Sequence, residues 1–250
     1  MLVIRDEKRI YRLKQISQWF SLIGMLALLA GLVMAFTALS GSANLVVYQL
    51  LALLGGWLLS QTGIFLAHRY ARDPRPDEVL DQQVKKVWRD GRMYHYVLPA
   101  PHVLLTPTGI VVFIAKFQGG KISVDGNRWS QKGLGMRKFF GQEGLGNPSR
   151  EAEIAVQSVA NYLRKHAPNV EEVLIAPVIV FTTKQAGELD LKGSSLPAVH
   201  FTKLKSFLRQ QRSKDKPMPL NDYEAIKAAF ERKAEHLVAK LQEEDDEVSA

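Results

Sequence analysis

The stretch that decides the fold is "PHVLLTPTGIVVFIAKFQGGKI", from Pro101 to Ile122. Two runs rich in β-branched residues, 102–106 and 109–117, flank a short Pro-Thr-Gly turn, and this pattern predicts two antiparallel strands. The second run ends with Lys116, which has no acidic neighbour and is followed by glycines. A lysine at the end of so apolar a strand needs an explanation, because charged residues are rarely buried unless they are paired.

The segments around this hairpin predict a mixed α/β domain. Apolar residues recur with helical spacing, or cluster in short runs typical of strands, and glycine-rich stretches separate several of these segments. The stretch from Lys132 to Gly146 is predicted to be a loop. The expected order is a helix at 77–90, strands at 93–98, 102–106, 109–117, 121–124 and 127–131, a helix at 147–166, strands at 172–181 and 198–201, and helices at 202–211 and about 222–244.

A charge-free block precedes this domain. No Asp, Glu, Lys or Arg occurs between Lys14 and Arg69. Within the block, Ile16–Leu39 and Leu45–Ala67 each exceed the roughly 20 residues that a helix needs to cross the hydrocarbon core. The sequence therefore predicts two transmembrane helices, and the short link Ser40–Asn44 predicts that they form a hairpin. A cleaved signal peptide is disfavoured because a second apolar run follows the first at once.

Basic residues near the two apolar runs predict the orientation. Short flanks rich in Lys and Arg resist translocation. Eight such residues lie in the outer flanks and none lies in the link: Arg5, Lys8, Arg9, Arg12, Lys14, Arg69, Arg72 and Arg75. Both termini are therefore expected in the cytoplasm, with the protein in the plasma membrane. The bilayer is the expected partner of the two helices, and the sequence leaves open a homo-oligomer formed through them.

These patterns divide the chain into five parts. The expected parts are a basic cytoplasmic N-terminus at 1–15, two transmembrane helices at 16–68, a linker at 69–76, an α/β domain at 77–211, and a C-terminal helix with an acidic tail at 212–250. The formal net charge is +8 although the tail is acidic, so the domain itself is basic. Anionic lipid and nucleic acid are the two partners that such charge suggests. The chain has no cysteine, which excludes disulfides and thiolate metal sites.

Residue detail narrows the fold. The run "HVLLTPTGIVVFIAKFQGGKI", the pair Arg128-Trp129 and the pair Asn147-Pro148 at the start of a helix resemble the NERD domain, the nuclease-related domain. The resemblance covers roughly Asp77 to Phe201. It implies a restriction-endonuclease-like domain, in which one acid precedes a central strand and an acid-x-Lys triplet ends the next. Two carboxylates there would hold a Mg²⁺ that activates water and neutralises charge on the scissile phosphate.

The resemblance assigns Lys116 to the family lysine, but both family acids are replaced. Pro101 stands where the first acid belongs, and Ile114 stands where the second belongs. Neither side chain carries an oxygen atom that could bind a metal. No metal site is therefore expected at these positions, and no cofactor is expected unless Mg²⁺ binds in another way.

Relocated carboxylates are the alternative. Glu78 matches a glutamate that is often found at the start of this domain, and Glu151 could approach from the later helix. With Lys116 they are the three candidate catalytic residues, and Mg²⁺ would be the cofactor of such a nuclease. The competing interpretation is that both are solvated acids in the first turns of helices, where they favour the helix dipole. His102 is interpreted as the side chain of a strand end rather than as a metal ligand.

A basic segment within the domain is a candidate nucleic-acid surface. Basic residues combined with aromatic side chains are typical of surfaces that bind single-stranded nucleic acid. Trp129, Phe139 and Phe140 lie among them. The basic candidates are Lys121, Arg128, Lys132, Arg137, Lys138 and Arg150.

Three functions remain open from the sequence. The first is a membrane-anchored, catalytically degenerate nuclease fold that binds nucleic acid or protein at the cytoplasmic membrane face. The second is an active Mg²⁺-dependent nuclease that uses Glu78 or Glu151. The third is a structural membrane protein whose basic face binds lipid. No phosphate-loop motif and no HExxH motif occurs in the chain.

Overall fold

The chain forms two compact units, each described here from a computed structural model. One unit begins with Met1–Asp6 and resumes at Pro76, and the other starts at Glu7 and runs to Arg75. The structure describes residues 1–38, 43–133, 143–171, 173–183, 186–213 and 216–239. The apolar hairpin is therefore an insertion in the α/β unit, placed between its first strand and its first helix.

The hairpin consists of two long helices, α1 (Glu7–Ala38) and α2 (Ala43–Tyr70). Both contain a stretch that is long and apolar enough to cross a membrane, by length and composition. Each helix is longer than its predicted span, because polar residues before the first apolar run and after the second continue the helix. Large apolar side chains such as Leu29, Phe36 and Leu51 are exposed around the hairpin. Such exposure is expected of helices that face lipid rather than water.

Small residues line the contact between α1 and α2. A Cβ atom added at Gly24 would lie 2.6 Å from the backbone nitrogen of Ser60 and 2.8 Å from the carbonyl oxygen of Gly56. A Cβ atom at Gly63 would lie 2.7 Å from the nitrogen of Ser21. The two backbones thus approach too closely for larger side chains, as is typical of membrane helices that pack through small residues.

Substituting Gly24 should therefore separate the helices. We expect Gly24→Leu to destabilise the hairpin by about 1–3 kcal/mol, the usual cost of overpacking. Gly55→Leu is the matched control, because among the described residues nothing lies within 4 Å of a Cβ atom added there. Titration with sodium dodecyl sulfate in detergent micelles, followed by circular dichroism, measures the effect. Equal behaviour of the two variants would contradict the close contact at Gly24.

The α/β unit is built on a six-stranded mixed sheet. Its strand order is β1-β2-β3-β4-β7-β9. Strands β2, β3 and β4 are successively antiparallel, whereas β1, β7 and β9 pair in parallel with their neighbours. The six strands are β1 (Leu2–Arg5), β2 (Arg92–His95), β3 (His102–Thr106), β4 (Gly109–Lys116), β7 (Ile175–Phe181) and β9 (Ala198–His200). This arrangement confirms the predicted mixed α/β class and the β3–β4 hairpin.

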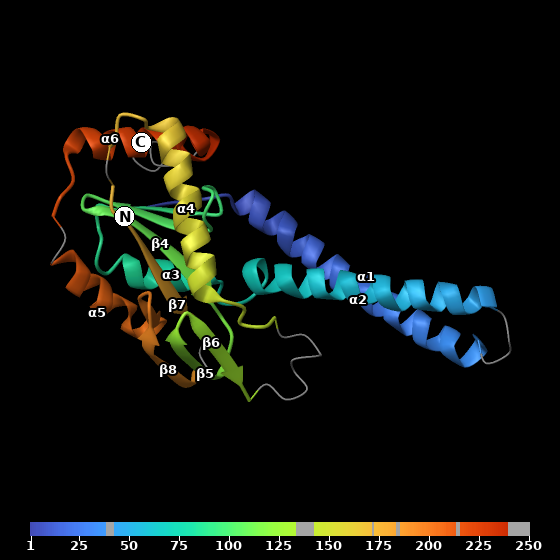
Figure 1. Cartoon of the computed structure of the whole chain (residues 1–250). Coiled ribbons are helices and arrows are strands. Elements are labelled where there is room, and N and C mark those ends of the chain that lie inside the picture. Colours follow the sequence, from blue (N-terminus) through green and yellow to red (C-terminus); the bar gives the residue numbers. More distant parts are fainter. Residues whose placement is uncertain (39–42, 134–142, 172, 184–185, 214–215, 240–250) are drawn as a thin grey trace. The chain divides into compact units, whose positions relative to one another are not determined.

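Helices cover both faces of this sheet (Figure 1). Helices α4 (Pro148–His166) and α6 (Leu220–Lys233) pack on the face that carries Ile110, Val112 and Ile114. Helices α3 (Pro76–Val84) and α5 (Phe201–Arg212) pack on the opposite face, which carries Phe113. The strict alternation of side chains along β4 places its even-numbered and odd-numbered residues in these two separate cores.

Strand β1 is absent from the predicted order of elements. Its partners are Leu2 with Arg92 and Arg5 with His95, and the side chain of Ile4 is fully buried. Four residues are too few to show a periodic pattern, so only the tertiary structure identifies them as a strand. The segment predicted as a basic N-terminus at 1–15 is therefore divided between the edge strand of the sheet and the start of α1.

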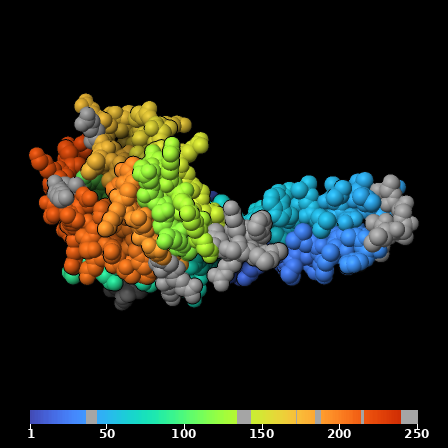
Figure 2. Space-filling view, turned by 60° about the horizontal axis from the view of Figure 1, so that its bottom comes forward, coloured from blue at the N-terminus to red at the C-terminus, as the bar shows by residue number. Residues whose placement is uncertain are grey.

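A second, three-stranded sheet has the order β6-β5-β8. Strands β5 (Gly120–Gly126) and β6 (Arg128–Lys132) form the predicted hairpin at Asp125-Gly126. Strand β8 (Ala186–Ser194) pairs in parallel with β5 and is absent from the predicted order. Figure 2 shows β8, in orange, beside the lime-green strands β5 and β6. Most of the predicted loop at 132–146, and the tail at 240–250, lie outside the described residues.

Tyr94 is the largest fully buried side chain of the core between the sheet and helices α4 and α6. Its ring packs edge-on against Phe230, with 5.3 Å between the ring centroids. Its hydroxyl group is buried without a hydrogen-bond partner among the described residues. Burial, assisted by the nearby carboxylate of Glu231, raises the pKa of the Tyr94 hydroxyl well above its ordinary value.

Tyr94→Phe should therefore be tolerated. We expect the free energy of unfolding to rise by about 1 kcal/mol at pH 8, because a buried hydroxyl without a partner is costly. In the natural protein the raised pKa contributes stability below about pH 10, where tyrosine ionises in the unfolded chain, and this contribution is lost as the pH rises further. Urea midpoints at pH 8 and pH 10.5 test both effects. A variant that is less stable at pH 8 would show that the hydroxyl has a bound partner.

Candidate functional site

The candidate site lies at the end of β4. Lys116 is the last residue of this strand, and its side chain is 6% exposed. Its Cβ points to the same face as Ile114, toward helix α4. The local sequence explains the strand: six consecutive apolar residues, four of them β-branched, precede the lysine and pair with β3 and β7. A cation is thus placed at the edge of an apolar core.

Two oxygen atoms accept hydrogen bonds from the ammonium group of Lys116. The Nζ atom of Lys116 lies 2.6 Å from Oε1 of Glu151 and 3.0 Å from the carbonyl oxygen of Leu145. Glu151 itself is 45% exposed, so the pair joins a buried ammonium to a carboxylate at the surface. The ammonium donates both hydrogen bonds. The question raised by the sequence is therefore answered: Lys116 ends the strand as one half of an ion pair.

The start of α4 fixes the position of Glu151. Asn147 caps this helix by accepting a hydrogen bond from the backbone nitrogen of Arg150 at 3.1 Å, and Pro148 occupies its first turn. Glu151 lies in the same first turn. There it favours the helix dipole, as one interpretation of the sequence proposed, and it also contacts Lys116, as the other required. The two interpretations of Glu151 are not exclusive.

The other catalytic candidates do not join this pair. Ile114 is 5% exposed and belongs to the apolar core. Pro101 directly precedes β3, and its carbonyl oxygen accepts a hydrogen bond from the backbone nitrogen of Tyr96 at 2.8 Å. Glu78 lies on α3, whose buried residues Leu80 and Val84 pack on the face of the sheet opposite to α4. The structure thus brings Lys116 and Glu151 together and places Glu78 in a different layer.

These residues do not fit the metal that the family pattern implies. A Mg²⁺ ion needs oxygen ligands at near-octahedral geometry, and one carboxylate at this place already accepts from an ammonium. Pro101 and Ile114 supply no side-chain oxygen. Among the residues that the structure describes, no group of three His, Asp or Glu side chains is arranged to hold a metal ion.

A buried polar chain on the other face is not evident from the sequence. The Nδ1 atoms of His95 and His102 lie 2.8 Å apart, and Nε2 of His95 lies 3.0 Å from Oδ1 of Asp81. One of the two Nδ1 atoms must therefore carry the shared proton. Asp81 and the fully buried Asp77 both face Arg5 of strand β1. His102, the first residue of β3, thus belongs to this buried chain of polar side chains.

The predicted nucleic-acid surface is electrically mixed. Lys121 and Lys132 lie directly opposite each other on β5 and β6, but Arg128 lies opposite Asp125. Nζ of Lys121 lies 2.7 Å from Oε2 of Glu188 on β8, and this hydrogen bond raises the pKa of Lys121. Asp190 of β8 is in register with Ser123. Glu188 and Asp190 of the unpredicted strand β8 therefore offset part of the positive charge.

The remaining residues of the predicted nucleic-acid surface do not belong to the sheet of β5, β6 and β8, except Trp129, or lie outside the described residues. Arg150 is exposed in the first turn of α4. Arg137, Lys138, Phe139 and Phe140 lie outside the described residues. Trp129 is half-buried: its indole nitrogen donates to Oγ of Ser149 at 2.8 Å, and its ring packs 5.9 Å from that of Phe181. Its role is therefore to join β6 to α4 rather than to offer a free stacking surface.

Comparison with known proteins identifies the family of this segment. Residues 78–182 match the family model described as "Nuclease-related domain", NERD. The segment is a NERD domain. The match includes Lys116, Glu151, and the positions Pro101 and Ile114 at which the family acids were expected. No curated protein and no solved structure matches the chain.

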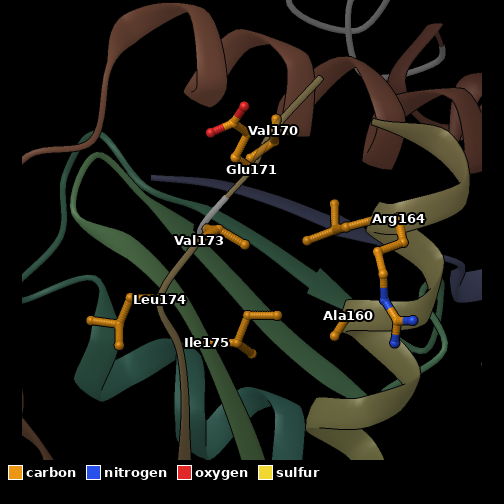
Figure 3. Close-up of a pocket in the computed structure, with 8 residues that line it drawn as sticks. Ala160, Arg164, Val170, Glu171, Val173, Leu174 and Ile175 are labelled. Atoms are coloured by element: carbon orange, nitrogen blue, oxygen red, sulfur yellow. The ribbon is translucent and has the colours of Figure 1, made fainter. Parts of the chain in front are cut away.

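The NERD domain also contains part of a cavity away from Lys116. It has a volume of about 630 Å³ and lies between the second half of α4 and the start of β7. Figure 3 shows the side chains of Val173 and Ile175 on one side of it and Ala160 and Arg164 of α4 on the other. Its lining is mostly aliphatic, with the charged residues Arg164 and Glu171.

Proposed function

We propose that this protein is a membrane-anchored NERD-domain protein whose nuclease-like site has lost metal-dependent catalysis and whose domain binds nucleic acid or protein. The observation that carries the proposal is the ion pair between Lys116 and Glu151. In a metal-dependent nuclease this lysine would act beside two metal-bound carboxylates. Here its ammonium is held by Glu151 and by the carbonyl oxygen of Leu145.

The apolar side chains around the pair support the same proposal. Ile114 places a branched alkyl group two residues before Lys116 on the same face of β4, where a metal ligand would be needed. A carboxylate could be supplied only from another element, and Glu151 already neutralises the lysine. In a hydrolytic mechanism at this site, the ion pair between Lys116 and Glu151 would have to break before Lys116 could bind a phosphate.

The test is a cleavage assay with the full-length protein in nanodiscs of zwitterionic lipid. Labelled single-stranded DNA, duplex DNA and RNA are incubated with about 10 mM Mg²⁺, a concentration high enough to fill a metal site of low affinity. We expect no cleavage above the background that a Lys116→Ala preparation gives. Mg²⁺-dependent cleavage that disappears in Lys116→Ala would overturn the proposal and establish the alternative, an active nuclease that uses Glu151.

Membrane anchoring is the second part of the proposal. Its support is the length and apolar character of α1 and α2, and the close packing of their small residues. Strand β1 adds an independent constraint on topology. Because β1 hydrogen-bonds to β2 in one sheet, the chain before α1 and the chain after α2 lie on the same side of any membrane that the helices cross. This pairing supports a hairpin that crosses the membrane an even number of times.

The basic flanks then favour the cytoplasmic side of the plasma membrane. A reporter fused after Ala250 should behave as cytoplasmic, and one inserted at Gly41 should behave as external, because the eight basic residues of the flanks resist translocation. Alkaline phosphatase and green fluorescent protein fusions measure the two locations. The reverse pattern would place the domain outside the cell and remove nucleic acid from its partners.

A further inference from the structure

A basic cleft lies between the turn that follows α3 and the second half of α5. Its volume is about 290 Å³, and its lining residues are Lys86, Val87, Arg89, Asp90, Arg209 and Arg212. Four of these six residues are cations and one is an acid. The cleft lies on the face of the sheet opposite to Lys116, because α3 and α5 share the core that contains Phe113. It is thus separate from the nuclease-like site.

One wall of this cleft is fixed. Nη1 of Arg212 donates to the carbonyl oxygen of Val87 at 2.6 Å, and its guanidinium group lies 4.6 Å from the centroid of the Trp88 ring. Trp88 is only 6% exposed, so it forms a firm base for the arginine. A guanidinium held by stacking and by a backbone carbonyl loses little conformational entropy when it binds an anion.

Within the cleft only Asp90 offsets the positive charge of the four basic residues. Helix α5 contains Lys203, Lys205, Arg209 and Arg212 and no acidic residue. Lys86, Arg89 and Arg209 are exposed, and within the described part of the chain no carboxylate forms an ion pair with them. This differs from the sheet of β5, β6 and β8, where Glu188 pairs with Lys121. An excess of positive charge in a concave site concentrates anions there.

The spacing of the cations favours an extended anion. Lys205, Arg209 and Arg212 follow each other at four and three residues, so they form one row along α5, of which Arg209 and Arg212 line the cleft. At 1.5 Å per residue this row is about 10 Å long. One strand of nucleic acid carries a phosphate about every 3.4 Å along the helix axis, so about three phosphates match the row. Trp88 is buried beneath Arg212, and the cleft offers no aromatic face for a base.

We propose that this cleft binds the phosphodiester backbone of nucleic acid without sequence specificity. The choice of nucleic acid as ligand rests on the proposed function. The inference adds the place at which the NERD domain would bind that ligand. Phosphates would lie between the Lys86–Arg89 side and the Arg209–Arg212 side of the cleft. The absence of base contacts makes the affinity depend on the number of phosphates and on salt.

The test measures oligonucleotide binding by the full-length protein in zwitterionic nanodiscs. Anisotropy of a labelled single-stranded DNA is recorded over a range of NaCl concentrations for the natural protein and for the double variant Lys86→Gln/Arg209→Gln. Arg212 is left unchanged because it packs on Trp88. We expect at least a tenfold loss of affinity at low salt. The slope of log affinity against log salt should fall in magnitude by about 1.4, that is about 0.7 for each lost contact.

The matched control is Lys121→Gln/Lys132→Gln, which removes the same charge from the sheet of β5, β6 and β8. It should change affinity less than twofold, and circular dichroism should show both variants folded. A double variant in the cleft that binds like the natural protein would overturn the inference while the proposed function stands. If the natural protein does not bind DNA at all, the nucleic-acid part of the proposed function fails as well.

A lipid headgroup is the competing source of phosphate. A soluble short-chain phosphatidylserine, added as competitor at equal phosphate concentration, separates the two. We expect it to displace the oligonucleotide poorly, because one phosphate occupies only part of the row on α5. Displacement as efficient as by unlabelled DNA would assign the cleft to lipid headgroups and overturn the inference.

Discussion

Replacing Arg5 by methionine should lower the free energy of unfolding of the α/β unit by about 3 kcal/mol, because it removes the arginine from an ion pair with a buried carboxylate. Nη1 of Arg5 lies 2.5 Å from Oδ2 of Asp77 and 3.8 Å from Oδ2 of Asp81. The side chain of Asp77 is 0% exposed, whereas that of Arg5 is 20% exposed. The partial exposure of Arg5 places the effect at the lower end of the range for broken buried pairs.

A loss of this size is a large part of the 5–15 kcal/mol that stabilises a typical domain. It also bears on topology, since Arg5 belongs to β1, the strand that holds the chain before α1 in the sheet. Urea denaturation of the full-length protein in detergent, followed by tryptophan fluorescence, measures the change. Lys8→Met is the control, because Lys8 is exposed.

Adding Asp77→Asn to Arg5→Met should recover part of the loss, because the amide needs no counter-charge. If Arg5→Met and Lys8→Met have equal midpoints, the ion pair contributes nothing, and the backbone hydrogen bonds of β1 and the packing of its apolar side chains suffice to hold it.

The second large effect is expected at the nuclease-like site. Glu151→Ala should destabilise the α/β unit by about 2 kcal/mol, within the range for hydrogen bonds to charged groups, because it leaves the 6%-exposed Lys116 with only the carbonyl oxygen of Leu145. Lys116→Met should cost less than 1 kcal/mol, because methionine fills a similar volume beside Ile114. The double variant should match Lys116→Met, so a double-mutant cycle gives a coupling near 2 kcal/mol.

An exposed ion pair on α6 serves as the control for the size of this effect. Glu224 and Lys227 lie 2.9 Å apart with side chains 54% and 24% exposed, and Glu224→Ala should cost no more than about 0.5 kcal/mol. Unfolding in urea measures all five proteins. A Lys116→Met variant that loses more stability than Glu151→Ala would contradict a role for Glu151 as the partner that Lys116 requires.

The local sequence determined the elements whose patterns are long and unambiguous. The charge-free block predicted the two long helices, because a helix without ions around its whole circumference has no face for water. The β-branched runs and the turn residues of 102–116 predicted β3 and β4 and placed Lys116 at a strand end. Asn147 and Pro148 predicted the start of α4, because their cap and N1 preferences act within one turn.

The tertiary structure alone decided which distant residues meet. Strand β1 has four residues, and β8 contains three charged residues and two glycines among its nine, so their pairing with β2 and β5 supplies a stability that their own sequences do not show. The neutralising acids near Lys121 and the Arg5–Asp77 pair follow from that pairing. Glu151 reaches Lys116 across 35 positions of sequence, and Arg212 reaches Val87 across 125. Such contacts depend on how helices lie on the sheet, which residue spacing along the chain does not encode.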